Sequence, residues 1–186
     1  MAILHRATLR PSKPELIATW LDREPWGGTG EVEVLASYRF DDPAGQVGVE
    51  AFLVGRGDRV LHLLLTYRDR PLESAESALV GTLEHSVLGT RWVYDGQHDP
   101  VARECFARAL RGEQEQAVLE VWDGETLVAT RESGVRLRVE PRPAEGEDGA
   151  LQIVRDTADA VAGDVRLVAD WGAGPVVVAA CSPVDA

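Results

Sequence analysis

The sequence predicts an α+β fold, in which a curved antiparallel meander sheet carries two main helices and continues into a C-terminal β extension. Apolar residues recur at every second position over 32–40 and 47–54, which is typical of strands. Residues 60–67 are apolar on both faces, so they predict a central strand. Short turn sequences join these runs, and the strands are therefore expected to be antiparallel neighbours. A sheet of roughly six to nine strands would have an ordinary size.

The first helix is predicted to begin after Ser12, because Ser12-Lys-Pro-Glu15 forms a capping-box pattern. In this pattern the hydroxyl accepts a hydrogen bond from the backbone three residues later, and the glutamate side chain reaches back. The helix is expected to stop near Asp22, ahead of Pro25 and two glycines. Its buried face would consist of four apolar residues at helical spacing, Leu16, Ile17, Trp20 and Leu21.

The second helix is predicted to begin with Asp99 as its N-cap and Pro100 at its first position. Gly112 suits the end of this helix. Cys105 lies on the apolar side of the helix and is expected to pack there. Cys105 and Cys181 are far apart in the sequence, and a lone pair of this kind is weak evidence for a disulfide.

Several smaller elements are also predicted. Residues 2–9 alternate loosely and are expected to form one edge strand, and 74–80 to form a short helix. Residues 82–94 are interpreted as two short strands or irregular backbone around a glycine. Residues 116–130 form the clearest hairpin, because their Asp-Gly pair favours a type I′ turn.

The chain is expected to divide near residue 130. Residues 1–130 are predicted to form one α+β unit. Residues 131–186 are predicted to be either a β-rich extension of the same sheet or a small second lobe. The acidic segment 141–149, rich in proline and glycine, is interpreted as a loop or linker. Four short strands are expected after residue 130, over 135–140, 151–155, 165–170 and 176–180.

The composition excludes some classes of partner. The 186 residues carry a formal net charge of −12, which argues against nucleic acids and anionic membranes, since both attract basic surfaces. No apolar run approaches the roughly 20 residues that a membrane helix needs. The first residues become polar too soon for a signal peptide, so a cytoplasmic location is expected. Lys13 is the only lysine in the chain.

Five residues are singled out as candidate contacts to a ligand or protein partner: His85, Trp92, Tyr94, Asp95 and His98. Aromatic side chains beside fixed polar groups suit both kinds of binding. A structural interpretation competes with this one, because Trp92 and Tyr94 share a strand face and could belong to the core. The sequence leaves this choice open.

The sequence predicts no catalytic, cofactor-binding or metal-binding residue. It contains no Cys-x-x-Cys or His-x-x-x-His pair, and the only lysine does not follow a glycine loop. Ser86 stands next to His85, but neighbours on a strand point to opposite faces, and no nucleophile elbow is present. Acid–base catalysis by a single side chain has no spacing rule and stays open. His62 lies in an apolar strand and is expected to be a hydrogen-bonded core residue.

Three segments resemble the N-terminal cap domain of actinobacterial maltokinases and related aminosugar kinases. They are Tyr38-Arg-Phe-Asp-Asp-Pro-Ala-Gly45, the run around 63–67, and Tyr94-Asp-Gly-Gln-His-Asp-Pro100. The resemblance covers roughly residues 1–130, and the whole chain looks like a free-standing protein of this cap type. It implies an antiparallel sheet with helices, likened to the cystatin topology, that packs on the nucleotide-binding lobe of a kinase and carries no catalytic residues.

The kinase motifs themselves are missing from this sequence. There is no His-x-Asp catalytic loop, no metal-binding aspartate motif and no strand lysine for ATP phosphates, and the residues after 130 are too few for a kinase C-lobe. We therefore expect a protein that is not an enzyme. The first hypothesis is an accessory module near glucan, maltose or trehalose metabolism, which binds a kinase or another enzyme or associates with itself. The alternatives are a binding module for sugars or sugar phosphates and a small acid–base enzyme.

Overall fold

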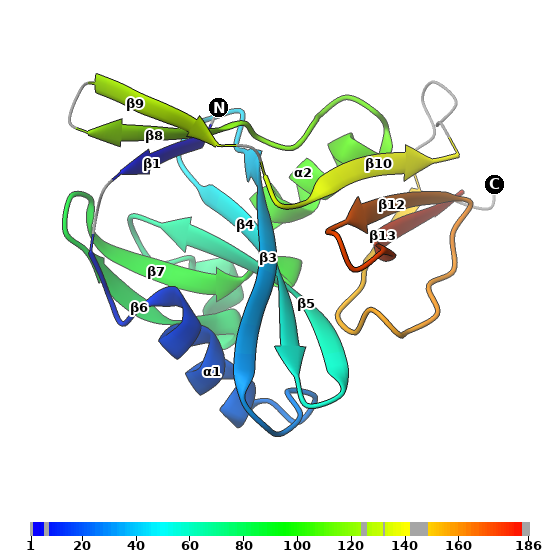
Figure 1. Ribbon diagram of the computed structural model, residues 1–186, viewed down its shortest axis with the longest axis horizontal. Helices are drawn as coiled ribbons and strands as arrows, with labels where there is room; N and C mark the ends of the chain where they lie inside the picture. The colour runs from blue at the N-terminus through cyan, green and yellow to red at the C-terminus, as the bar shows by residue number, and fades with distance from the viewer. Residues whose placement is uncertain (1, 6–7, 124–125, 132, 142–148, 184–186) are drawn as a thin grey trace.

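The computed structural model describes residues 2–5, 8–123, 126–131, 133–141 and 149–183. Its fold is α+β, with three β-sheets and two main helices, and the predicted fold class is confirmed (Figure 1). The largest sheet has six antiparallel strands in the order β2-β6-β7-β5-β4-β3. These strands span Leu9–Arg10 (β2), Val32–Asp41 (β3), Gly48–Arg56 (β4), Arg59–Arg68 (β5), Leu79–His85 (β6) and Gly89–Asp95 (β7).

Strand β5 lies inside the six-stranded sheet, as its two apolar faces predicted. It pairs with β4 along its whole length and with β7 over Leu65–Arg68 only. The predicted pair of strands around Gly89 is also confirmed, as the β6–β7 hairpin. Because both faces of β5 are covered, its apolar residues contribute to two separate cores.

The predicted helix starts are correct. Helix α1 (Lys13–Arg23) begins with the full capping box, since the Ser12 hydroxyl accepts from Glu15 N and the Glu15 carboxylate accepts from Ser12 N. Helix α2 (Pro100–Leu110) begins with Asp99, whose side chain accepts from Val101 N. Two 3₁₀ helices complete the set, η1 (Glu73–Ala78), where a short helix was predicted, and η2 (Gly96–His98).

Strands after residue 130 form a sheet of their own. Its order is β10-β12-β13-β11, with strands Arg136–Glu140 (β10), Gly149–Ile153 (β11), Val165–Asp170 (β12) and Pro175–Pro183 (β13). All its pairings are antiparallel. These strands therefore do not extend the six-stranded sheet.

The prediction of a single edge strand over residues 2–9 is wrong. Strand β1 (Ala2–His5) pairs in parallel with β8 (Leu119–Asp123), whereas β2 pairs with β6. Strand β9 (Thr126–Arg131) pairs with β8 and completes a three-stranded sheet. The 116–130 hairpin prediction is confirmed in its strands, but residues 124–125 of the Asp-Gly turn lie outside the described residues. The pairing of β1 with β8 joins segments more than 100 residues apart, which local patterns do not reveal.

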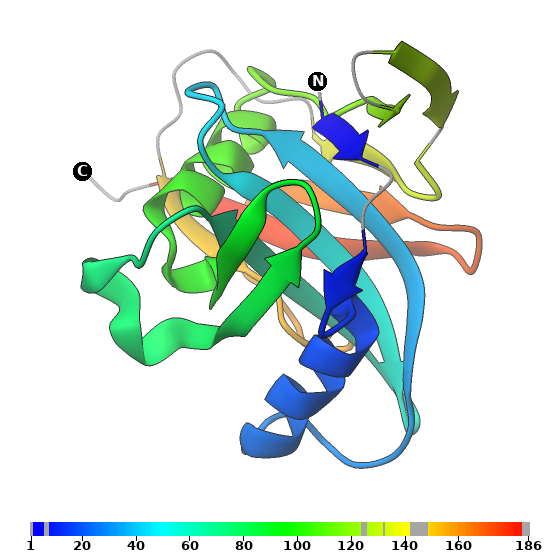
Figure 2. The same ribbon diagram turned by 90° about the vertical axis from the view of Figure 1, so that its left-hand side faces the viewer.

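Helix α1 covers one face of the six-stranded sheet (Figure 2). The apolar side chains of this face form one core with those of the helix, namely Leu16, Ile17, Trp20, Leu21, Phe52, Val54, Leu61, Leu63, Leu65, Val80, Leu83 and Val93. Burial of each large side chain contributes roughly 1.5–3 kcal/mol. The predicted helical face is thus the buried one.

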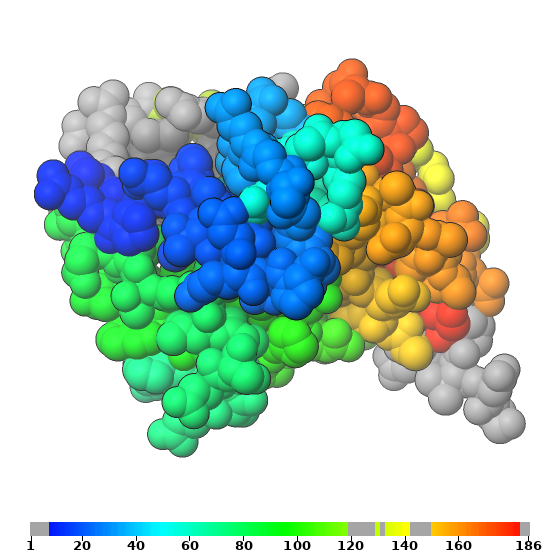
Figure 3. Space-filling view, turned by 90° about the horizontal axis from the view of Figure 1, so that it is seen from below, coloured from blue at the N-terminus to red at the C-terminus, as the bar shows by residue number. Residues whose placement is uncertain are grey.

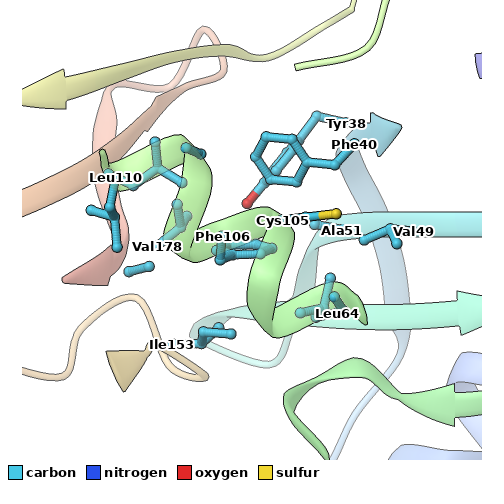
Figure 4. Close-up of a cluster of buried hydrophobic side chains, with 14 of the residues drawn as sticks. Tyr38, Phe40, Val49, Ala51, Leu64, Cys105, Phe106, Leu110, Ile153 and Val178 are labelled. Carbon is cyan, nitrogen blue, oxygen red and sulfur yellow. The ribbon is translucent and has the colours of Figure 1, made fainter. Parts of the chain in front are cut away.

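Helix α2 and the four-stranded sheet cover the opposite face. Phe106 lies at the centre of this second core, with Tyr38 and Phe40 from β3 around it (Figure 4). Cys105 is buried in the same core, as predicted, and its burial raises the thiol pKa to about 11. It is not joined to Cys181 by a disulfide.

The C-terminal part of the chain is also attached along β5. Where β7 no longer pairs with β5, His62 N donates to Arg155 O at 2.7 Å and Thr157 N donates to Val60 O at 3.0 Å. Figure 3 shows the segment after residue 150 packed directly beside the β4–β5 turn. Residues 155–157 therefore occupy the part of the β5 edge that β7 leaves open.

Candidate functional site

The string Tyr94-Asp-Gly-Gln-His-Asp-Pro100 is the most specific feature of the sequence, and its side chains are largely committed to the fold. Tyr94 is buried at the end of β7, and its hydroxyl accepts a hydrogen bond from Leu72 N at 2.8 Å. This bond ties the segment before η1 to the sheet. Tyr94 therefore contributes to the fold through both its buried ring and its hydroxyl.

Asp95 links the string to the C-terminal part of the chain. One carboxylate oxygen accepts from Gln97 N at 3.1 Å, and the other from Arg155 Nη2 at 2.5 Å. The Arg155 guanidinium also lies 4.0 Å from the centre of the Trp26 ring, within cation–π range. Arg155 thus links Asp95 of this string to Trp26, just after α1.

Asp99 is a fully buried carboxylate that accepts several hydrogen bonds. It accepts from Thr66 Oγ1 at 2.7 Å and from both Nε and Nη2 of Arg68 at 2.7 Å. Burial alone would raise the pKa of this carboxyl, but hydrogen bonds from Arg68, Thr66 and Val101 N outweigh it and lower the pKa. One carboxylate therefore caps α2 and fastens the helix to β5.

The other three candidates do not converge. His85 is the last residue of β6, and its Nδ1 accepts from Val87 N at 3.2 Å and Leu88 N at 3.1 Å in the turn that follows. Trp92 is half-buried in the middle of β7 and is in register with Thr82. His98 is exposed, with 64 % of its side-chain surface accessible, and its Nε2 lies 3.9 Å from Asp95 Oδ2.

The five candidates are thus strung along the hairpin rather than gathered in one pocket. Asp95 and His98 are the pair that the structure brings together. Within the described ranges, no group of three or more His, Cys, Asp or Glu side chains is placed to hold a metal ion. Likewise, no helix among the described residues is long and apolar enough to cross a membrane.

His62 is the buried histidine predicted from the sequence. Its Nε2 lies 2.8 Å from the Tyr38 hydroxyl and its Nδ1 lies 2.9 Å from Val154 O. A neutral ring that donates from Nδ1 and accepts at Nε2 satisfies both partners. Burial lowers the pKa of this imidazole to about 4, despite the favourable backbone hydrogen bond to Val154. His62 joins β3, β5 and the C-terminal part of the chain as a neutral ring.

The model of the maltokinase N-terminal cap domain matches residues 20–99. These residues are thus similar to that cap domain, and we call them the cap-like domain. The match begins inside α1, contains strands β3 to β7 and ends at the N-cap of α2. A search of the curated proteins found no match.

A further charged cluster lies on the α1 side of the six-stranded sheet, where Lys13 at the start of α1 meets Glu50 of β4. Lys13 Nζ lies 2.5 Å from Glu50 Oε2, and the lysine is also within cation–π range of the Tyr67 ring, at 5.4 Å. Burial and the nearby Glu50 charge raise the pKa of the Tyr67 phenol well above its usual value. The only lysine of the chain is therefore engaged in an ion pair next to the sheet.

A hollow lies next to β10, mostly outside the cap-like domain. A cavity of about 750 Å³ opens between β10 and the loop of residues 112–118, which arches above β10 in Figure 1. Its floor is apolar and its rim is polar. The floor comprises Phe40, Ala109, Val135, Leu137, Val139 and Leu167, and the rim includes Gln114, Gln116, Ser133, Arg136 and Arg138. None of the five sequence candidates lines this cavity.

A second hollow of about 600 Å³ lies on the other side of the same loop. Both hollows share residues 114–118, including Val118, which is an exposed apolar residue. Arg108 and Asp41 belong to the lining of the second hollow. We define the β10 groove as the larger cavity together with the outer edge of β10.

Sequence analysis missed the residues of the β10 groove. A signal was present, because Arg136-Leu-Arg-Val-Glu140 alternates polar and apolar side chains and predicts a strand with one polar face. What the sequence does not show is that β10 lies at the edge of its sheet, or that Gln116 reaches it from a loop. Arg155 was missed for a similar reason, since its partner Asp95 is 60 positions away.

Proposed function

We propose that this protein is a non-catalytic accessory module that recognises another protein. The observation that carries the proposal is the match of residues 20–99 to a kinase cap domain, whose most specific string is committed to internal contacts. These side chains hold β5, α2 and the C-terminal strands together. They are poorly suited to catalysis, because their movement would destabilise the fold. The β10 groove offers an exposed alternative for contact with a partner.

The resemblance to maltokinase caps favours a cytoplasmic role near glucan, maltose or trehalose metabolism. The expected partner is a sugar kinase or a glucan-metabolising enzyme. An acidic surface supports this interpretation in one respect, since the net charge of −12 disfavours nucleic acids and anionic membranes as competing partners.

The test uses the purified full chain as bait in a native cytoplasmic extract, with an unrelated protein of similar net charge as the control bait. We expect one enzyme to be enriched on the wild-type bait and not on the unrelated control bait, and to bind the purified protein in calorimetry. The His98→Ala variant should retain it, because His98 is exposed and lies outside the groove. Recovery of this protein's own copies alone would contradict the accessory role.

A second candidate function is the binding of a sugar or sugar phosphate. It is favoured by the cavity of about 750 Å³, whose volume lies within the range of roughly 300–1,000 Å³ that is common for ligand pockets. A thermal-shift panel of sugars, sugar phosphates and nucleotides tests it. A ligand at 100 times its Kd should add about 2.7 kcal/mol to the unfolding free energy. Unchanged melting temperatures across the panel would remove these ligand classes.

A further inference from the structure

We propose that the β10 groove binds an extended segment of the partner protein, which adds to the edge of β10 as a strand of alternating acidic and apolar residues. This inference rests on the accessory role proposed above and specifies the chemistry of the partner. Three features of the groove support it: backbone groups of β10 that point away from its sheet, the Gln116 side chain that bonds to them as a strand would, and the side chains on the two faces of β10.

Strand β10 lies at the edge of its sheet. Among the described residues its one strand partner is β12, in an antiparallel register that places Leu137 opposite Ala169 and Val139 opposite Leu167. Leu137 N bonds to Gln116 instead of β12, so residues 137 and 139 direct their backbone groups away from the sheet. An edge strand that directs backbone N–H and C=O groups away from its sheet is a template for the addition of another strand.

Gln116 already occupies the first position of this template. Its Nε2 donates to Val135 O at 2.7 Å, and its Oε1 accepts from Leu137 N at 2.7 Å. One residue of a parallel strand makes the same two bonds, to the carbonyl of residue i and the amide of residue i+2. The next such pair along β10 is Leu137 O and Val139 N. An incoming parallel strand would bond to these two groups and continue the ladder that Gln116 begins.

The side chains around this edge define the sequence that the strand should have. Arg136 and Arg138 are exposed on one face of β10, although the protein as a whole carries a charge of −12. Arg138 Nε donates to Glu140 Oε1 on the same face at 2.6 Å, so an acidic residue of the partner would bind Arg136 directly and share Arg138 with Glu140. Leu137 and Val139 lie on the other face, towards the apolar floor of the cavity. Residues beside each other on adjacent strands interact most strongly when their charges are opposite or both are apolar. Acidic residues should therefore alternate with aliphatic ones.

The backbone bonding can be separated from the charge effect with one substitution. Val139→Pro removes the outward N–H, and proline is tolerated in edge strands where the missing N–H does not face the sheet. Val139→Ala is the matched control, because it shortens the side chain and keeps the N–H. Arg136→Glu with Arg138→Glu tests the charges. Arg10→Glu with Arg70→Glu, at two exposed positions away from the groove, is the control variant with the same change in net charge.

The probe is a fluorescein-labelled, end-capped hexapeptide of alternating glutamate and valine, titrated with the full chain in fluorescence anisotropy. We expect saturable binding that weakens with salt. Val139→Pro and N-methylation of the peptide backbone should each weaken it about tenfold or more, as loss of a hydrogen bond implies. The double arginine variant should weaken it similarly, and the two control variants should change it less than about twofold.

Several results would overturn the proposal. They are a peptide that does not bind, binding that survives both Val139→Pro and backbone methylation, and a lysine–valine peptide that binds as well as the glutamate one. Dimerisation of the protein in light scattering that Val139→Pro abolishes would assign the edge to a second copy instead. If the peptide does not bind, and the Val139→Pro variant still captures the enzyme that the wild-type protein captures from extract, then strand addition to β10 is wrong and the accessory role stands. Capture of no enzyme by the wild-type chain contradicts the role itself.

Discussion

Replacement of Asp99 should destabilise the protein more than any other change within the string. Asp99→Ala removes the N-cap of α2, which is worth about 1 kcal/mol, and leaves the Arg68 guanidinium and the Thr66 hydroxyl without their acceptor. Removal of one partner from a buried ion pair costs about 3–5 kcal/mol. Arg68 keeps 15 % of its side-chain surface accessible, and water can reach part of the guanidinium, so we expect the lower end. The predicted total is about 3–4 kcal/mol.

Asp99→Ser separates the two contributions, because serine is an equally good N-cap but brings no charge. It should cost about 1 kcal/mol less than Asp99→Ala. Asp69→Ala, at a nearby exposed carboxylate, serves as the control and should change stability by less than about 0.5 kcal/mol. The assay is equilibrium unfolding in urea, followed by tryptophan fluorescence. If Asp99→Ala costs about 1 kcal/mol and Asp99→Ser costs nothing, Asp99 acts only as a cap and the buried ion-pair reasoning is refuted.

Three other predictions follow from single groups. The pKa of His62 is about 4 in the folded state, below the unfolded value of about 6.5. The unfolded state therefore binds one more proton between these pH values, and the unfolding free energy should decrease by about 3 kcal/mol as the pH falls from 6.5 to 4. In His62→Gln, the slope of unfolding free energy against pH should be smaller by the contribution of this one proton. Arg155→Ala should cost about 2–3 kcal/mol, since it strips Asp95 of its partner and removes the Trp26 contact, whereas equal stability of variant and wild type would contradict the bridge. Burial raises the pKa of the Cys105 thiol to about 11, so in the Cys181→Ser variant this thiol should react with a thiol reagent at pH 8 only after unfolding in urea. Reaction of Cys105 in the folded variant would contradict this prediction and show that the core opens.

The elements that local chemistry determines were predictable from the sequence. Both helix starts depend on a cap and its immediate neighbours, at Ser12 and Asp99, and both are correct. The central position of β5 follows from the apolar character of its two faces. His62 was identifiable as a core residue for the same reason, since a lone histidine between leucines needs buried partners.

The features that depend on distant contacts were not predictable. Nothing in the sequence near Asp95 indicates that Arg155 will donate to it, because the two residues are 60 positions apart. The pairing of β1 with β8 and the separate sheet of β10 to β13 also depend on which distant segments meet. The open edge of β10 belongs to the same class, since Gln116 reaches it from a loop 20 positions earlier in the chain.

Cross-linking in living cells tests most directly whether the β10 groove is the surface that a partner protein contacts. A photo-cross-linking residue is placed at two exposed positions, Glu140→p-benzoylphenylalanine at the end of β10 and His98→p-benzoylphenylalanine in the cap string. We expect one discrete partner to cross-link from position 140, and this cross-link should disappear when Val139→Pro is added. No partner should cross-link from position 98. A partner that cross-links from position 98 and not from position 140 would contradict this expectation.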